Sequence, residues 1–91
     1  MYKIARSKKY GKDFRRLEMS GRFNQKKLDN VIDTLAGGFD LPPSYRNHPL
    51  HGRFAGAFGC HIEPDLVLVY KKLEDILVLY LIRVGSHSDL F

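Results

Sequence analysis

The sequence has too little cysteine for a disulfide and no apolar run long enough for a membrane span. Cys60 is the single cysteine, so an internal disulfide is excluded and a reducing compartment is expected. A helix that crosses a bilayer needs ~20 apolar residues in succession, and every apolar run here is far shorter. The first residues carry charge without the apolar stretch of a signal peptide. We therefore expect a cytoplasmic protein without membrane contact.

Length and charge narrow the classes of function. The 91 residues have room for one domain, residues 1–91, and none for a separate ligand-binding lobe. Lys and Arg number 15 against 10 Asp and Glu, a net charge of +5. The first thirty residues hold ten of these cations and three of the acids, which gives them +7 and leaves −2 for the remainder. This balance favours a polyanionic or acidic partner over a neutral metabolite.

The first half of the chain predicts a strand and two helices. Residues 2–6 alternate in polarity, typical of an edge strand with Tyr2 and Ile4 on its buried side. Ser7 and Asn24 are candidate caps, and apolar residues recur at helical spacing after each of them. Glycines stop both predicted helices. We expect the two helices to form an antiparallel pair.

The second half predicts strands. Prolines make residues 41–49 a surface crossing. Residues 61–63 alternate in polarity, and residues 66–70 and 76–82 are continuous apolar runs, typical of strands buried on both faces. Residues 85–91 are small and polar, and we expect a tail there. The predicted fold is α+β in the order β-α-α-β-β-β, with two N-terminal helices packed on one face of a small, mainly antiparallel sheet.

The four histidines all lie in the second half, at loops or strand ends. Histidine gives and takes protons near neutral pH. With Asp65 near His61, and Arg83 shortly before His87, the chain offers a base, an acid and a cation. These groups suit RNA cleavage by the ribose 2′-hydroxyl, which needs a base for the 2′ proton, an acid for the 5′ oxygen and a cation for the charge on phosphorus. We interpret His51 as solvent-facing.

Each of these residues also has a structural interpretation. A histidine in a loop can be a plain polar residue, Arg83 can pair with a carboxylate at a sheet edge, and Asp65 follows a proline as turn residues do. Metal binding is a third interpretation, because a second histidine lies three residues after His48 and Cys60 precedes His61. This spacing does not match a structural zinc site. We expect neither a metal nor a cofactor.

The basic excess of the first thirty residues predicts a contact surface for phosphate backbones. A solvated helix face is the alternative, but tyrosines lie among these charges. Such a surface sets affinity and orientation, not sequence choice. The residues expected to contact RNA are Lys8, Lys9, Lys12, Arg15, Arg16, Lys26 and Lys27.

Three linked motifs occupy the second half. They are Asn47-His48-Pro49-Leu50-x-Gly52, then Cys60-His61-Ile62-Glu63-Pro64-Asp65-Leu66-Val67-Leu68-Val69-Tyr70, and Arg83-Val84-Gly85-Ser86-His87-Ser88-Asp89-Leu90-Phe91. In this order they closely resemble the YafQ-type toxins of the RelE/ParE superfamily, which belong to bacterial type II toxin–antitoxin systems. The resemblance implies a microbial RNase of RelE-like fold that enters the ribosomal A site and cleaves mRNA without a metal. It also implies a DinJ- or RelB-like antitoxin that neutralises the free, monomeric toxin.

The resemblance assigns roles to individual residues. The acid/base set that it implies consists of His48, His61, Asp65 and His87. Within that set His87 is the general acid, and the other three share the role of base. Arg83 steadies the phosphate, Phe91 packs against a base, and the cations of the first helix contact ribosomal RNA.

Some positions depart from the family pattern. Family members carry an arginine and an acid where this chain has Phe58 and Gly59, and we expect Arg53 to substitute for the missing cation as a substrate-binding residue. Leu66 stands where a tryptophan follows the aspartate in YafQ, so a stacking contact with the substrate base is lost there. Two other functions stay open: a non-catalytic inhibitor of DNA gyrase, like the ParE branch, and a plain RNA-binding module with structural histidines.

Overall fold

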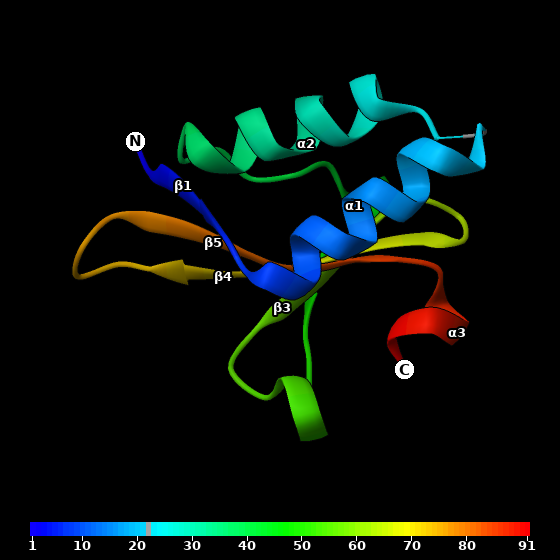
Figure 1. The fold of residues 1–91 in the computed structure, drawn as a ribbon. Coiled ribbons are helices and arrows are strands. Elements are labelled where there is room, and N and C mark those ends of the chain that lie inside the picture. Colours follow the sequence, from blue (N-terminus) through cyan, green and yellow to red (C-terminus); the bar gives the residue numbers. More distant parts are fainter. Residues whose placement is uncertain (22) are drawn as a thin grey trace.

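The computed structural model describes residues 1–21 and 23–91 (Figure 1). Arg22, one of the ten cations counted in the first thirty residues, lies outside the described residues. The strands are β1 (Lys3–Arg6), β2 (His48–Pro49), β3 (Phe58–Glu63), β4 (Leu66–Leu73) and β5 (Val78–Gly85). The helices are α1 (Lys8–Ser20), α2 (Gln25–Ala36) and α3 (His87–Leu90), and two 3-10 turns are η1 (Pro43–Tyr45) and η2 (Gly52–Phe54).

The five strands form one sheet in the order β1-β5-β4-β3-β2. The predicted edge strand β1 pairs in parallel with β5, and the other neighbours are antiparallel. In Figure 1, α1 and α2 cover one side of this sheet, while η2 and α3 project on the other. The prediction of an α+β fold with two helices packed on a mainly antiparallel sheet is confirmed.

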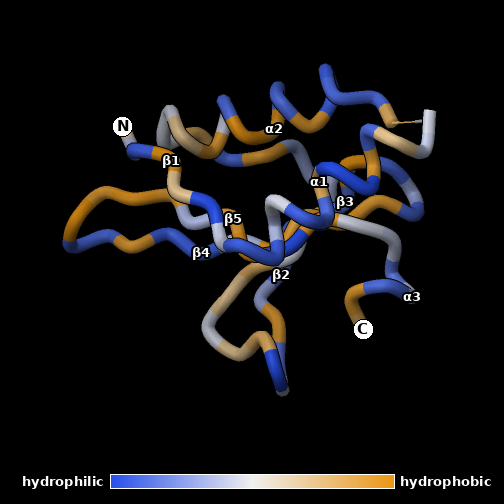
Figure 2. Tube along the Cα trace, viewed as in Figure 1, coloured by the Kyte–Doolittle hydropathy of each residue, from blue (hydrophilic) through white to orange (hydrophobic). Residues whose placement is uncertain are grey.

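Both long helices begin at the predicted caps. Ser7 Oγ accepts a hydrogen bond from the Tyr10 N–H (2.9 Å), and Asn24 Oδ1 accepts one from the Lys27 N–H (3.3 Å). Gly21 ends α1 at φ 74°, a left-handed conformation that a side chain disfavours. Figure 2 shows polar and apolar residues alternating along both helices, as amphipathic sequences predict. No helix in the described ranges is long and apolar enough to cross a bilayer.

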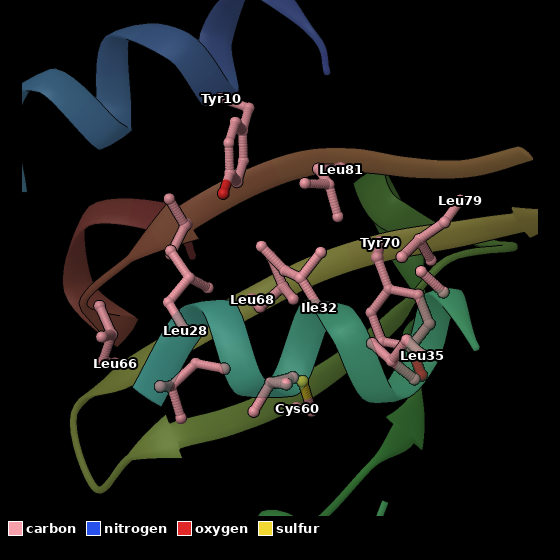
Figure 3. Close-up of a cluster of buried hydrophobic side chains, with 14 residues drawn as sticks. Tyr10, Leu28, Ile32, Leu35, Cys60, Leu66, Leu68, Tyr70, Leu79 and Leu81 are labelled. Atoms are coloured by element: carbon pink, nitrogen blue, oxygen red, sulfur yellow. The ribbon is translucent and has the colours of Figure 1, made fainter. Parts of the chain in front are cut away.

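The main core lies between α2, α1 and the sheet (Figure 3). Leu28, Ile32 and Leu35 of α2 point toward the sheet, and each is at most 6% exposed. Leu68 and Tyr70 of β4 pack against them from the sheet. Because this packing covers one face of the sheet, the opposite face is the one left for a site.

That opposite face carries a smaller core. Val67 and Val69 of β4 are buried there with Ala57 and Leu90. Successive strand residues point to opposite faces, so β4 buries both faces, as its continuous apolar run predicted. The smaller core holds α3 against the sheet.

Two strand predictions were partly wrong. Ile4, expected on a buried side, is 38% exposed, because β1 extends beyond the two helices at the edge of the sheet (Figure 1). The run 76–82 was expected to be buried on both faces, but β5 starts only at Val78, and Ile76 lies in the hairpin turn at 65% exposure. Within β5, Leu79 and Leu81 are buried, while Val78, Tyr80 and Ile82 are half-buried.

The expected tail and surface crossing contain regular structure. Residues 85–91 contain α3 (His87–Leu90), where Ser86 Oγ accepts a hydrogen bond from the Asp89 N–H (3.2 Å) and Leu90 is fully buried. A serine followed by an acid three residues later is a helix-start signal, and the polar composition of the segment masked it. The crossing contains β2, whose two residues pair with β3.

Candidate active site

Three histidines lie in a row at one end of the sheet. The ring centroids of His48 and His61 are 6.2 Å apart, and those of His61 and His87 are 6.5 Å apart. The row ends at Phe91, whose ring centroid is 4.8 Å from that of His87. Residues that are far apart in the sequence are therefore gathered in one site.

The order of the strands explains this gathering. His48 begins β2 and pairs across the sheet edge with Gly59 of β3. His61 lies two residues further along β3, on the same face as Gly59. His87 is the first residue of α3, directly after β5. The sheet face opposite the long helices thus carries the histidines.

A pocket of about 250 Å³ contains the row. Its lining consists of His48, Leu50, His51, His61, Val67, His87 and Phe91; we call it the histidine pocket. His61 is half-buried, whereas His48, His51 and His87 are exposed. His51, interpreted from the sequence as solvent-facing, is exposed and also lines this pocket. The position of His51, three residues after His48, was the sequence signal that could have placed it in the predicted site.

The His48 ring has a defined hydrogen bond to the backbone. Its Nδ1 lies 2.6 Å from the carbonyl oxygen of Arg46, and Arg46 has a left-handed backbone conformation (φ 50°). A carbonyl oxygen only accepts hydrogen bonds, so Nδ1 carries the proton. In neutral His48, Nε2 therefore has a free lone pair and can act as a base.

Asp65 lies in the turn between β3 and β4 and holds the start of α3. Its Oδ1 accepts a hydrogen bond from the backbone N–H of His87 (3.2 Å). The carboxylate is exposed and next to the histidine row. The structure thus brings Asp65 to the predicted site, as an anchor for the backbone of His87.

Phe91 and Arg53 meet at the other end of the row. Phe91 is 49% exposed, and its ring packs edge-on against Phe54 at 5.5 Å. Arg53 Nη2 donates a hydrogen bond to the carbonyl oxygen of Leu90 (3.0 Å), and its guanidinium lies over the Phe54 ring. Arg53 therefore supports the end of α3 and places a positive charge near Phe91.

Arg83 lies beside the row, not in the lining of the histidine pocket. Its Nε and Nη2 donate to the two carboxylate oxygens of Asp13 at 2.7 and 3.1 Å. Hydrogen bonding to the Asp13 carboxylate raises the pKa of the Arg83 guanidinium. Arg83 instead lines a neighbouring pocket of about 240 Å³, the arginine pocket, formed by Ser7, Lys8, Lys9, Arg53, Phe54, Ile82 and Arg83. Arg83 thus pairs with a carboxylate, as considered from the sequence, but the carboxylate belongs to α1 and not to a sheet edge.

The predicted RNA-contact residues are all exposed. They are Lys8, Lys9, Lys12, Arg15 and Arg16 on α1, with Lys26 and Lys27 on α2. Lys8 and Lys9 line the arginine pocket, and Arg16 forms an exposed ion pair with Asp89 of α3 (3.8 Å). The basic face of α1 is thus next to the histidine row in space, although the two are far apart in sequence.

The two departures from the family motif have structural consequences. Phe58 is 40% exposed and stacks on Tyr70, with ring centroids 6.1 Å apart. Gly59 is buried, and a Cβ added there would lie 3.1 Å from Leu50 Cδ2. Leu50 thus occupies the space in which an acidic side chain would stand.

The possible metal ligands do not converge. Cys60 is fully buried in the main core, whereas His61 points to the opposite face of β3. In residues 1–21 and 23–91, no group of three His, Cys, Asp or Glu side chains could hold a metal ion. Burial raises the pKa of the Cys60 thiol to about 12, so it stays protonated and is a poor ligand.

The α+β topology of this domain is shared with bacterial toxins of known structure. Residues 2–91 match the model of the family described as a bacterial toxin of type II toxin–antitoxin system, YafQ. The chain belongs to the YafQ family. The mRNA interferase toxin YafQ of Escherichia coli (strain K12) is 34% identical over 89 residues, which cover 97% of this chain and 94% of the relative.

Solved structures agree with this assignment. The crystal structure of a metal-bound toxin from Helicobacter pylori is 42% identical, with a TM-score of 0.91 and full coverage of both chains. The toxin in the Escherichia coli DinJ–YafQ complex is 30% identical, with a TM-score of 0.86, and the match covers 100% of this chain and 99% of that chain.

Proposed function

We propose that this toxin is a ribosome-dependent endoribonuclease that cleaves mRNA in the A site and so inhibits translation. The observation that carries the proposal is the row of three imidazoles that ends at the exposed Phe91. The name of the Escherichia coli relative, an mRNA interferase, supports the same activity. The reaction uses the ribose 2′-hydroxyl as nucleophile, so it needs proton transfer but no metal.

The proposed proton transfers run along the row, with His87 as the acid that the motif resemblance implies. His48 Nε2 takes the proton of the 2′-hydroxyl, and the 2′-oxygen forms a bond to the adjacent phosphorus. The bond from phosphorus to the 5′-oxygen breaks, and protonated His87 gives that oxygen its proton. The products are a 2′,3′-cyclic phosphate and a free 5′-hydroxyl. His61, between the two, faces the phosphate and stabilises its negative charge when protonated.

Arginines supply further positive charge at this site. Arg53 faces the phosphate on the Phe91 side, where its guanidinium is exposed. Arg83 contacts the phosphate through Nη1, for which no hydrogen bond is found among the described residues, while Asp13 holds its other nitrogens. Asp65 acts by holding His87 in place.

The exposed cations of α1 and α2 place the protein on ribosomal RNA. Their contacts would be salt-sensitive, because each neutralised phosphate releases counterions. The same surface suits an acidic segment of a cognate antitoxin, and the related Escherichia coli toxin is seen in a complex with DinJ. The free toxin is proposed to act as a monomer in the cytoplasm.

Cleavage of synthetic mRNA on programmed ribosomes tests the proposal. The purified toxin, stripped of bound metal with EDTA and freed of the chelator before it meets the ribosomes, should still cut the A-site codon, and H87A and H48A should each lose at least about a hundredfold in rate. Lys3→Gln on β1, at the far edge of the sheet, is the matched control and should cut normally. Growth arrest that survives loss of His48, His61 and His87 together would favour a gyrase-type inhibitor. Salt-sensitive RNA binding without fragments would favour a binding module.

A further inference from the structure

A second pocket adjoins the histidine pocket along the edge of β3. Its volume is about 360 Å³, and its lining consists of Lys27, Ser44, Tyr45, Arg46, His61, Ile62, Glu63 and Pro64; we call it the Tyr45 pocket. His61 lines both pockets. A strand of RNA whose scissile phosphate lies at His61 can therefore extend into the Tyr45 pocket on one side and toward Phe91 on the other.

The Tyr45 pocket combines the groups that bind a nucleotide. Lys27 of α2 and Arg46 are exposed cations suited to a phosphate. Tyr45 packs against the main core on one side and lines the pocket on the other, so its ring is held in place. A fixed aromatic ring is a stacking platform for a base. The Ser44 hydroxyl and the Glu63 carboxylate add hydrogen-bonding groups.

The direction of the RNA follows from the two ends of the histidine row. Arg46 lines the Tyr45 pocket, and its carbonyl oxygen accepts the hydrogen bond that fixes the His48 ring. His48, the proposed base, thus belongs to this side, and His87, the proposed acid, contacts Phe91 on the other. The base takes its proton from the nucleotide that carries the 2′-hydroxyl, whereas the acid serves the nucleotide that leaves with the 5′-oxygen.

We propose that the Tyr45 pocket binds the ribonucleotide on the 5′ side of the scissile phosphate, with its base on Tyr45 and its phosphate at Lys27 and Arg46. The nucleotide on the 3′ side then lies against Phe91. This assignment rests on the proposed endoribonuclease activity. It adds a binding subsite and a direction of the RNA to that activity.

The test pairs protein variants with altered substrates. Ribosomes are programmed with synthetic mRNA in which the A-site codon has one cleavable ribose, the other positions being 2′-O-methylated. In two further substrates the base is removed either from the nucleotide 5′ of the cleaved bond or from the nucleotide 3′ of it. The measured quantities are KM and kcat for each pair of protein and substrate.

The effect of Tyr45→Leu should depend on the presence of the base on the 5′ side of the cleaved bond. On the complete substrate, Tyr45→Leu should lower kcat/KM roughly tenfold, as the loss of one stacked base does. On the substrate that lacks the 5′ base, Tyr45→Leu and the unchanged protein should be equal. Tyr45→Phe, which keeps the ring, should retain the rate on the complete substrate, and this also controls for folding.

The charged part of the subsite has its own variant. Arg46→Asn removes the cation but tolerates the left-handed backbone of this position. Combined with Lys27→Gln, it should raise KM roughly tenfold with little change in kcat. Lys3→Gln also removes a positive charge, but on β1, and should leave KM unchanged.

Three outcomes overturn the assignment. A loss in Tyr45→Leu that persists on the substrate without the 5′ base would show that the ring does not stack on that base. A loss that disappears only when the 3′ base is missing would reverse the direction of the RNA. Failure of the unchanged toxin to cut the complete substrate would overturn the endoribonuclease activity itself, and the subsite with it.

Discussion

Asp13 and Arg83 form a two-point ion pair that joins α1 to the end of β5. The carboxylate of Asp13 is 4% exposed and also accepts a hydrogen bond from the backbone N–H of Val84 (3.2 Å). Among the described residues it is the one buried polar side chain. α3 and His87 begin directly after this point of β5. The pair therefore fixes the basic helix relative to the strand that carries the proposed acid.

Removal of one partner should destabilise the fold. Asp13→Ala leaves the largely buried Arg83 guanidinium and the Val84 N–H without their acceptor. We expect a loss of about 3 kcal/mol in the free energy of unfolding, measured by urea denaturation. Arg16→Ala is the control, because its ion pair with Asp89 is long and exposed, and it should cost no more than about 0.5 kcal/mol. Equal losses in both variants would contradict the role given to Asp13.

Much of the fold was predictable because its signals are local. Ser7 and Asn24 each cap a helix through a hydrogen bond to a residue three positions later. The apolar run at the start of β4 identified the central strand, because a continuous apolar run is typical of a strand that is covered on both faces. These features depend on neighbours in sequence and need no knowledge of the tertiary structure.

The site was only partly predictable because its contacts are not local. Asp13 and Arg83 are 70 residues apart in the chain, and no feature of either segment indicates that these two residues pair. The motif resemblance predicted His48, His61 and His87, but their order in the row follows from strand pairing. The Arg46 carbonyl that fixes the His48 ring depends on one left-handed residue, for which the sequence gives no clear sign.

Asp65 should act through its hydrogen bond and not through its charge. An asparagine side chain at this position would keep an oxygen that accepts the His87 N–H, so Asp65→Asn should retain most of the ribosomal cleavage rate. Asp65→Ala loses that acceptor, and we expect roughly a tenfold fall in kcat as the start of α3 loosens. Single-turnover cleavage on programmed ribosomes measures both variants. If Asp65→Asn were as slow as Asp65→Ala, the charge would matter and Asp65 would act on a proton.

Alkaline pH should unfold the protein through its buried acids. Burial raises the pKa of Cys60, Tyr10 and Tyr70 to about 12, above the values of about 8.5 for Cys and 10 for Tyr in an unfolded chain. The folded state thus keeps protons that the unfolded state releases. The stability from each group is complete below the unfolded pKa and is lost as pH rises toward 12, at about 1.4 kcal/mol per pH unit.

Thermal unfolding between pH 8 and pH 12 measures this loss. Cys60→Val keeps an apolar side chain of similar size in the main core but removes one of the ionisable groups. Its unfolding temperature should therefore fall less steeply above pH 9 than that of the unchanged protein. Identical slopes for the two proteins would show that the Cys60 thiol does not contribute.

A carboxylate at position 59 should alter the proposed base. Gly59 is the cross-strand partner of His48 and lies on the same face of β3 as His61, so a side chain there would be next to both imidazoles. In Gly59→Glu the negative charge favours the charged imidazolium over the neutral imidazole of His48. Because a base must be neutral to accept the 2′ proton, the acid limb of the pH profile of the cleavage rate should move to higher pH.

The neutral variant separates charge from shape. A Cβ at position 59 comes within 3.1 Å of Leu50 Cδ2, so Gly59→Gln displaces the Leu50 side chain as Gly59→Glu does but adds no charge. The acid limb of the pH dependence of kcat/KM on programmed ribosomes should shift in Gly59→Glu and stay in place in Gly59→Gln. An acid limb that moves equally in both variants would assign the effect to Leu50 packing. An acid limb that stays in place in both variants would contradict the role of His48 as the base.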